Sequence, residues 1–260
     1  MKNVGVIGAG NMGGALISGL LKDKQNYTVF VYDVNEKMVN KYADNGAIPA
    51  GTIDVLAKKC EYVIVAVKPN IYDKILDELA SVSFDKTVIT IAPGISIEYV
   101  KSRLKGKAKV VRTMPNTPAL ISMGVTLMAK EAGEELDEVA KIFKAVGEVY
   151  YIPEKMMNAG VALSGSSPAY VYSFINALAD GAALQGIPKK SALEIAANTV
   201  IGSALMVLKA GKHPMELLDN VCSPGGTTIE AVNVLKENNF ESTVIKAMNA
   251  CVEKSNKMSK

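Results

Sequence analysis

The chain has 260 residues, 49% of them hydrophobic, and a formal net charge of +3. This length allows one large or two modest domains, and the small charge excludes the electrostatic footprint of a protein that binds nucleic acid or an anionic membrane surface. We expect neither a signal peptide nor an apolar run long enough to span a bilayer. Three cysteines without a C-x-x-C pair and one histidine argue against a disulfide scaffold or a zinc site. We therefore expect a cytoplasmic protein with reduced thiols, no bound metal and no membrane or nucleic-acid partner.

The first predicted element is a strand at Val4–Ile7, followed by a glycine-rich turn. Gly8, Gly10 and Gly13 have the spacing G-x-G-x-x-G, and a helix is predicted over residues 15–21. In this context the glycines permit a tight turn, the close approach of a pyrophosphate, and close packing of helix and strand. The free N–H groups and positive dipole end of the helix would face the phosphates. A turn that binds no ligand can have the same glycine spacing, so the element that follows decides between these two interpretations.

That element is a second predicted strand, residues 28–32, which ends at Asp33. An acidic residue at this place is typical of the group that hydrogen-bonds the adenosine ribose of a dinucleotide. The two elements together predict a dinucleotide site at the start of the chain.

Strands and helices go on alternating through the first half of the chain. Strands are predicted at residues 62–67, 87–92, 109–112, 125–128 and 149–152, and helices at residues 36–45, 71–79, 97–104 and 136–146. The continuous apolar runs are typical of parallel strands buried on both faces. The alternation predicts an α/β Rossmann domain, with a doubly wound parallel sheet, over residues 1–153.

The second half, residues 154–260, contains no convincing strand and is predicted to be an all-α domain. Its helices are predicted at residues 170–184, 191–208, 214–221, 228–236 and 242–257. Small residues such as Ala177 and Gly181 indicate closely approaching helices. The sequence leaves open whether these helices pack within one subunit or between two.

Two stretches follow predicted strands, Val65–Pro69 and Met114–Pro118. They are expected at the carboxyl edge of the sheet, where ligands bind in such folds. Asn116 and Thr117, between two prolines that stiffen the loop, would offer fixed polar contacts to a nicotinamide or its ribose. Lys68 would donate to the cofactor or lie in solvent. Proline and glycine are also common in ordinary turns, so each stretch taken alone could be a strand-ending turn that binds no ligand.

A third stretch, Ser223–Glu230, reads Ser-Pro-Gly-Gly-Thr-Thr-Ile-Glu. Thr227 and Glu230 fit a capping box, which leaves the hydroxyl of Thr228 less constrained. The glycines keep side chains away, so free backbone N–H groups at the helix start can surround a small anion. The second half has no arginine, so this loop is the first candidate for holding a substrate carboxylate, and Arg112 is the second. A plain glycine loop that caps a helix is the alternative.

Other catalytic arrangements are poorly supported. The serines of residues 164–167 do not form a G-x-S-x-G motif, and a lone His213 does not supply a catalytic triad. We expect His213 to be a surface or helix-capping residue. Cys222 is expected to be a small buried side chain rather than a redox-sensitive thiol.

These stretches together resemble pyrroline-5-carboxylate reductase, the last enzyme of proline synthesis. The resemblance covers essentially the whole chain. It rests on Gly-Ala-Gly-Asn-Met-Gly (8–13), Ala-Val-Lys-Pro (66–69), Met-Pro-Asn-Thr-Pro (114–118), Leu-Ser-Gly-Ser-Ser-Pro-Ala-Tyr (163–170), Ala-Leu-Ala-Asp-Gly (177–181) and Asp-Asn-Val-Cys-Ser-Pro-Gly-Gly-Thr-Thr (219–228). The last motif is the most specific. The chain departs from the family at Asp33, where many relatives have a small polar residue, and at Ser167, where glycine is common.

The resemblance implies NAD(P)H-dependent reduction of L-1-pyrroline-5-carboxylate to L-proline, by hydride transfer to the ring C=N carbon. It also implies a helical dimerisation domain, a homodimer whose helical domains interleave, and assembly of such dimers into a ring. The fingerprint and the resemblance together give as expected cofactor-binding residues Gly8, Ala9, Gly10, Asn11, Met12, Asp33, Asn35, Ala66, Val67, Lys68, Pro69 and Asn116. The resemblance gives as substrate-binding residues Ser223, Gly225, Gly226, Thr227 and Thr228. The Thr228 hydroxyl is the expected catalytic group and would approach the ring nitrogen.

The chemistry agrees with that implication. An iminium can arrive already protonated, so its reduction requires no histidine or carboxylic acid, whereas a hydroxy-acid dehydrogenase must remove a hydroxyl proton. A β-hydroxyacid dehydrogenase, the rival enzyme, would need a lysine on the first long helix after the boundary, and residues 158–184 contain none. A dinucleotide sensor without catalytic activity is the rival from another class, and it gives no reason for the Ser-Pro-Gly-Gly-Thr-Thr loop.

The choice of cofactor stays open at this point. The family implies NADPH, which we expect, with NADH as the alternative. Asp33, however, would favour the 2′-hydroxyl of NAD and repel the phosphate of NADP, while Asn35 and Lys37 follow closely and could hold a phosphate.

Overall fold

The computed structural model describes residues 1–82 and 86–259, and these divide into two compact units. The first unit is Met1–Pro168 together with Ala250–Lys260, and the second is Ala169–Asn249. The division differs from the boundary predicted after Pro153. Glu154 accepts a hydrogen bond from the backbone N–H of Ile97, and Asn158 donates one to Asn256, so residues just beyond Pro153 are tied to the first unit.

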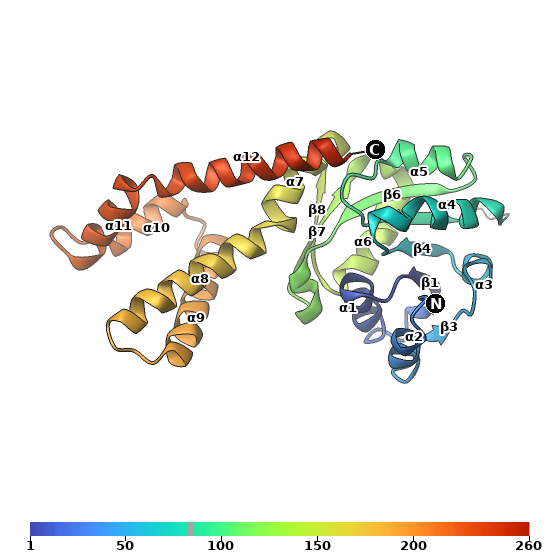
Figure 1. The fold of residues 1–260 in the computed structure, drawn as a ribbon, viewed down its shortest axis with the longest axis horizontal. Helices are drawn as coiled ribbons and strands as arrows, with labels where there is room; N and C mark the ends of the chain where they lie inside the picture. Colours follow the sequence, from blue (N-terminus) through green and yellow to red (C-terminus); the bar gives the residue numbers. More distant parts are fainter. Residues whose placement is uncertain (83–85, 260) are drawn as a thin grey trace. The chain divides into compact units, whose positions relative to one another are not determined.

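An eight-stranded sheet forms the centre of the first unit (Figure 1). Its strands are β1 (Lys2–Ile7), β2 (Tyr27–Tyr32), β3 (Ile48–Pro49), β4 (Tyr62–Val65), β5 (Thr87–Thr90), β6 (Lys109–Met114), β7 (Gly124–Ala129) and β8 (Gly147–Ile152), in the order β3-β2-β1-β4-β5-β6-β7-β8. Neighbours from β3 to β6 are parallel, which confirms the predicted doubly wound sheet. Every residue of β4 and β5 is buried, as expected for parallel strands covered on both faces.

The sheet is not parallel throughout. β6 and β7 are antiparallel, with Thr113 opposite Met128, and β8 is parallel to β7. The predicted doubly wound parallel sheet therefore has one antiparallel pairing, β6 with β7. The reason is the short connection over residues 115–123, because a parallel crossover needs about a dozen residues or more.

Helices cover both faces of the sheet in the first unit. They are α1 (Asn11–Leu20), α2 (Glu36–Ala43), α3 (Ile53–Lys59), α4 (Tyr72–Ser81), α5 (Ile97–Arg103), α6 (Leu136–Lys144) and α7 (Met157–Gly160). Buried residues of α3, α4 and α5 pack against one face, and those of α1, α2 and α6 against the other. Short 3-10 turns join them at η1 (Pro69–Ile71), η2 (Thr117–Ile121), η3 (Lys130–Glu135) and η4 (Glu154–Met156), and residues Val161–Gly165 (η5) form a π-helical turn.

The second unit is built from helices alone in the part of the chain that the structure describes (Figure 1). They are α8 (Ser167–Leu184), α9 (Lys189–Lys209), α10 (Pro214–Val221), α11 (Thr227–Glu237) and α12 (Phe240–Met258), and α8 and α12 extend into the first unit. All five were predicted from the sequence. By length and composition α9 is apolar enough to cross a bilayer, which corrects the expectation that no apolar run reaches that length. Only 11% of its most apolar window is buried within the chain.

Candidate functional site

The turn between β1 and α1 is shaped by backbone contacts that only glycine allows. Gly8 has a positive φ of 98°, and its N–H donates to the carbonyl oxygen of Tyr32 at 2.8 Å. A Cβ on Gly8 would lie 2.7 Å from the carbonyl oxygen of Ala66, and a Cβ on Gly13 would lie 1.9 Å from that of Gly8. The glycine spacing in the sequence is therefore a requirement of the fold here.

The start of α1 is left open toward a ligand. Gly10 is the N-cap residue, and no side chain caps the helix. The first N–H groups of a helix have no partner within the helix, and with the dipole they favour an anion. A Cβ on Gly10 would meet no atom within 4 Å, so the space beside it is a cradle that a side chain would fill. These features fit a pyrophosphate.

A cavity of about 710 Å³ adjoins this turn at the carboxyl edge of the sheet. Its volume is in the range of sites for small molecules and cofactors. It is lined by residues of the glycine turn, of the ends of β1, β2 and β6, of the segments that follow β2, β4, β5 and β6, and of the π-helical turn η5: Ile7, Gly8, Gly10, Asn11, Met12, Tyr32, Asp33, Val34, Ala66, Val67, Lys68, Pro69, Ile71, Ile75, Ile91, Ala92, Pro93, Met114, Pro115, Asn116, Thr117 and Gly165. The dinucleotide site predicted from the sequence thus coincides with a real cavity.

Most of the predicted cofactor-binding residues line this cavity. They are Gly8, Gly10, Asn11, Met12, Asp33, Ala66, Val67, Lys68, Pro69 and Asn116. Ala9 and Asn35 do not line it, but their backbone N–H groups donate to the carboxylate of Asp33. Sequence reasoning missed the lining segment Ile91–Pro93, although its position at the end of a predicted strand was a usable signal.

Asn116 has a supporting role that the sequence did not reveal. Its side chain is buried, with Nδ2 donating to the carbonyl oxygen of Ser164 at 3.0 Å and Oδ1 accepting from the N–H of Val125 at 2.8 Å. Because both ends of the amide are engaged, Asn116 holds the loop after β6 against β7 and the π-helical turn that contains Ser164. Its expected contact with the cofactor stays a prediction.

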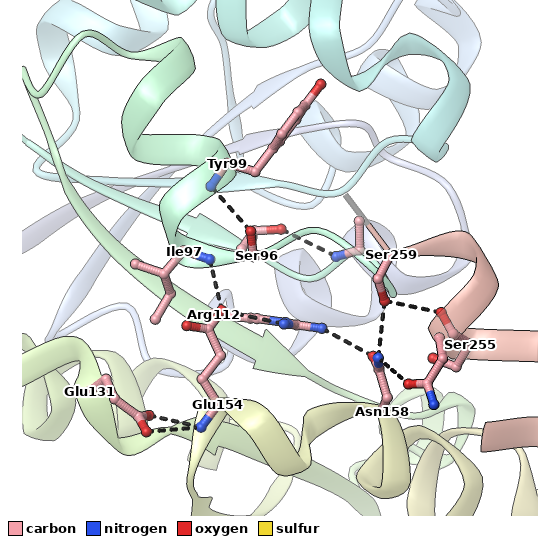
Figure 2. A network of polar contacts seen from close by, with 12 residues as sticks. Ser96, Ile97, Tyr99, Arg112, Glu131, Glu154, Asn158, Ser255 and Ser259 are labelled. Atoms are coloured by element: carbon pink, nitrogen blue, oxygen red, sulfur yellow. Dashed lines mark hydrogen bonds and ion pairs between the residues drawn. The ribbon is translucent and has the colours of Figure 1, made fainter. Parts of the chain in front are cut away.

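Arg112, the second candidate for a substrate carboxylate, is committed elsewhere. Figure 2 shows it buried in a polar network, with Nη1 3.3 Å from Oε1 of Glu154 and Nη2 donating to Oδ1 of Asn158 at 3.5 Å. The same Glu154 oxygen accepts from the N–H of Ile97 at the start of α5. Arg112 therefore joins β6 to η4 and α7, and this arrangement removes it as the carboxylate-binding candidate.

Charged side chains are scarce around the cavity. Among the described lining residues, Asp33 is the one acid and Lys68 the one base, and no histidine is present. Cys60 is not a hidden nucleophile, because burial raises the pKa of its thiol to about 12. Burial likewise raises the pKa of Tyr72. Its hydroxyl donates to Oγ1 of Thr90, the last residue of β5, at 2.6 Å. The described lining of the cavity thus offers few groups that could act in general acid–base catalysis.

The Ser-Pro-Gly-Gly-Thr-Thr loop belongs to the second unit and joins α10 to α11. The N–H of Gly226 donates to the carbonyl oxygen of Ser223 at 3.0 Å, and Gly225 has φ +66°, which with proline before it fits a type II turn. Gly226 is the N-cap of α11 and no side chain caps the helix. The predicted capping box with Thr227 as N-cap is therefore wrong, because the helix begins at Thr227.

The start of α11 has no capping side chain. With no capping side chain, the first N–H groups of this 11-residue helix are open, as they are at α1. Among the described residues, neither Thr227 nor Thr228 has a hydrogen bond from its hydroxyl.

His213 is the N-cap of α10, where its Nδ1 accepts from the N–H of Met215 at 3.2 Å. This confirms its expected capping role.

Comparison with known proteins assigns both halves of the chain. A family profile described as pyrroline-5-carboxylate reductase dimerisation matches residues 154–258, and one described as NADP oxidoreductase, coenzyme F420-dependent, matches residues 3–94. A pyrroline-5-carboxylate reductase of Escherichia coli strain K12 is 43% identical over 100% of this chain and 99% of its own length. One from Arabidopsis thaliana is 37% identical over 98% and 95%. The chain belongs to the pyrroline-5-carboxylate reductase family.

A solved structure extends this agreement to the fold. The pyrroline carboxylate reductase of Plasmodium falciparum, with NADP bound, is 30% identical and has a TM-score of 0.89, covering 100% of this chain and 98% of that one. Membership of the pyrroline-5-carboxylate reductase family confirms the resemblance stated from the motifs and the fold class, a Rossmann domain followed by helices of the dimerisation type. It decides against the rival dehydrogenase and sensor.

Proposed function

We propose that the chain reduces L-1-pyrroline-5-carboxylate to L-proline with NADPH, the last step of proline biosynthesis, and that NADH is an alternative donor. The observation that carries this proposal is the full-length relationship to pyrroline-5-carboxylate reductases. The cavity at the sheet edge supports it independently, because it has the size and the open helix start that a dinucleotide requires.

The chain's own residues hold the cofactor at two places. The N–H groups that begin α1, from Asn11 onward, bind the pyrophosphate beside Gly10. The segment Ala66–Pro69 lines the cavity. Asn116 lines it too and holds the loop after β6 in place through its hydrogen bond to Ser164. The bound cofactor supplies the hydride, and the protein's contribution is to orient it.

The substrate carboxylate is held by the loop before α11. Ser223 and the backbone N–H groups of Gly225, Thr227 and Thr228 donate to it, aided by the positive end of the helix dipole, while the N–H of Gly226 closes the turn. The hydroxyl of Thr228, which has no partner among the described residues, hydrogen-bonds the ring nitrogen. A protonated imine needs no further acid, which agrees with the absence of histidine among the described lining residues.

The second unit serves for assembly. We propose a homodimer in which the helical domains interleave, and a ring of such dimers, in the cytoplasm. The support is the dimerisation profile over residues 154–258 and the exposure of large apolar side chains along α9, among them Ile195, Ile201 and Leu208. Burial against a second copy would give α9 the cover that a helix apolar on all sides needs.

The proposed activity is tested by following NADPH and NADH oxidation at 340 nm, with and without L-1-pyrroline-5-carboxylate. Substrate-dependent oxidation, with L-proline as the product, is the expected result. No absorbance change at high enzyme concentration would overturn the assignment.

The role of Thr228 is tested by two variants. Thr228→Ala is expected to lower turnover by about 100-fold, a typical contribution of one positioned proton-bearing group, while cofactor affinity stays unchanged. Thr228→Ser keeps the hydroxyl and is expected to restore most of the turnover. Equal rates for wild type and Thr228→Ala would remove this hydroxyl from the mechanism.

A further inference from the structure

A line of buried hydroxyls crosses the sheet where three neighbouring strands end. Tyr72, the first residue of α4, and Thr90, the last residue of β5, are both fully buried. The Tyr72 hydroxyl donates to Oγ1 of Thr90 at 2.6 Å and lies 3.4 Å from the carbonyl oxygen of Val65, the last residue of β4. In β6, the hydroxyl of Thr113 donates to the carbonyl oxygen of Thr90 at 3.2 Å. Side chains therefore join β4, β5 and β6 at their carboxyl ends.

The backbone pairing of the sheet does not require these hydroxyls. β4 and β5 pair along their whole length, with Val65 opposite Thr90, and the backbone hydrogen bonds of that ladder form whatever the side chains are. A buried hydroxyl costs free energy unless it is hydrogen-bonded, so phenylalanine and valine would serve an apolar core equally well. A fully bonded polar network in a core does something that apolar packing does not, because it fixes one arrangement of the groups that it joins. The hydroxyls therefore indicate a role beyond holding the sheet together.

Two of these strand ends lead directly into the lining of the cavity. Val65 is followed by Ala66–Pro69, which lines the cavity. Thr90 is followed by Ile91–Pro93, which lines it too. Neither Tyr72 nor Thr90 is among the described lining residues, so neither is placed to touch a bound cofactor. The pair lies instead at the point where both lining segments begin.

Thr90 also holds the second lining segment directly. Its Oγ1 accepts from the N–H of Ala92 at 3.4 Å, within Ile91–Pro93. Two donors, the Tyr72 hydroxyl and the Ala92 N–H, thus meet at one oxygen and fix the rotamer of the Thr90 side chain. Without the Tyr72 hydroxyl, Thr90 loses the shorter of these two bonds and its side chain is held less firmly. The Tyr72 hydroxyl therefore acts on the position of the lining segment through Thr90.

We propose that Tyr72 is a positioning residue for the cofactor, which acts through Thr90 to hold the two lining segments in the arrangement that binds NADPH. The apparent affinity of a ligand falls with the fraction of the protein that has the binding-competent arrangement. Removal of the Tyr72 hydroxyl lowers that fraction, so NADPH binds more weakly although no contact with the cofactor has been removed. The proposal rests on the dinucleotide site of the proposed function but not on its reaction.

The test is isothermal titration calorimetry of NADPH on the full-length protein without substrate, for wild type, Tyr72→Phe, Thr90→Val and the double variant. Each change removes a hydroxyl and keeps the shape of the side chain. Each single variant should bind NADPH about tenfold more weakly, the effect of a competent fraction of about one tenth. Because the two residues act as one unit, their losses should not add in the double variant. Thr90→Ser, which keeps the hydroxyl, should bind NADPH as wild type does.

Tyr62→Phe is the matched control. Tyr62 begins β4, at the other end of the strand from Val65, and it is buried. Among the described residues its hydroxyl has no hydrogen bond, so the change removes the same atom from a buried tyrosine of the same sheet and leaves the bonds of Tyr72 intact. We expect its NADPH affinity to equal that of wild type.

Hydrogen exchange separates positioning from a general loss of stability. In cofactor-free Tyr72→Phe, exchange of the amides in residues 66–71 and 91–96 should accelerate more than in β1, and saturating NADPH should restore the protection. Unchanged NADPH affinity in Tyr72→Phe, losses that add in the double variant, or exchange that accelerates equally in β1 would each overturn the proposal. Since the titration contains no substrate, a chain that shows the expected pattern but does not reduce the imine would refute the proposed reaction alone.

Discussion

Two glycines in the turn between β1 and α1 are needed for different reasons. The chain's own backbone requires Gly13, because a Cβ there would lie 1.9 Å from the carbonyl oxygen of Gly8. Nothing in the packing of the described residues requires Gly10, since a Cβ there meets no atom within 4 Å. The proposed pyrophosphate site supplies the missing reason, because a side chain at Gly10 would fill the cradle.

This contrast makes a prediction for two alanine variants. Gly10→Ala should keep the melting temperature of wild type but bind NADPH and NADH on the order of tenfold more weakly, a loss of about 1.4 kcal/mol. Gly13→Ala should lose about 1–3 kcal/mol of stability through overpacking. Thermal unfolding and calorimetric titration measure the two effects. Unchanged cofactor affinity in Gly10→Ala would place the pyrophosphate elsewhere.

Glu135 links the sheet to the start of α6 and should affect acid stability. It accepts hydrogen bonds from Nζ of Lys109 at 2.7 Å and from Oγ1 of Thr87 at 3.0 Å. The hydrogen bond from Lys109 is the main cause that lowers the pKa of Glu135 below its ordinary value of 4.5. A lowered folded-state pKa stabilises the fold above the unfolded value, and this contribution is lost as the pH falls through the folded value.

We therefore expect Glu135→Gln to reduce the free energy of unfolding at neutral pH, and the difference from wild type to shrink as the pH falls from 4.5 through the lowered pKa of Glu135. Urea titrations across this range measure it. The neighbouring Glu134 is exposed and has no hydrogen bond or ion pair in the described part of the chain, so Glu134→Gln serves as the control. A pH-independent difference between wild type and Glu135→Gln would mean that lost packing, rather than ionisation, carries the effect.

At the scale of elements, long apolar patterns were predictable and short or context-dependent ones were not. The strand β4 is apolar throughout and β5 has an apolar pair between two threonines, and so the burial of both strands could be predicted from the sequence. β3 has two residues, Ile48–Pro49, too few for any periodicity. α3 was missed, although Thr52 caps it by accepting from the N–H of Val55 at 3.2 Å and was a readable start signal.

The site was predictable where backbone geometry alone determines it. Gly8 and Gly13 could be assigned because their spacing reflects a steric requirement. The hydrogen bonds of Arg112 and Asn116 could not be predicted from the sequence. Their partners, Glu154 and Ser164, are distant in sequence and contact them only in the folded chain. Helix α11 begins at Thr227 rather than one residue later, because the type II turn makes Gly226 the N-cap.

The end of α12 docks on the first unit through side-chain amides and hydroxyls (Figure 2). Asn158 Nδ2 donates to Oδ1 of Asn256 at 2.8 Å and to Oγ of Ser259 at 2.9 Å. A Cβ on Gly94, in the loop after β5, would lie 2.9 Å from the carbonyl oxygen of Met258. The helix end therefore packs against the loop that begins with the cavity-lining Pro93.

We expect Asn158→Ala to loosen this end of the helix. Losing its two hydrogen bonds to the helix end, together with the longer one from Arg112, should cost about 1–3 kcal/mol, and hydrogen exchange of the amides in residues 250–258 should accelerate more than elsewhere. Asn45→Ala, which removes a single exposed hydrogen bond to the carbonyl oxygen of Lys41, is the control. Exchange that is unchanged over residues 250–258 would show that backbone packing at Gly94 holds the helix end without Asn158.

At the scale of the whole molecule, the second unit has almost no core of its own. Its buried apolar residues, among those that the structure describes, are Ala179, Ala192 and Ala196. Large side chains are exposed instead, with Leu184 at 86% and Leu208 at 75%. Since monomeric proteins rarely expose continuous apolar surface of this kind, the helices need a partner surface to be stable, and the dimerisation profile indicates a second copy.

If a second copy supplies that core, folding and association are coupled. The melting temperature should then rise with protein concentration, because dimerisation stabilises the folded chain by mass action. Ile201→Glu, which places a charge on the exposed apolar surface of α9, should give monomers in sedimentation velocity and a lower melting temperature. Ile48→Glu changes the same residue type at an exposed position in β3 of the first unit and should remain a dimer. A wild-type chain that sediments as a monomer, with a melting temperature independent of concentration, would refute the dimer, and the exposed face of α9 would then need a different partner.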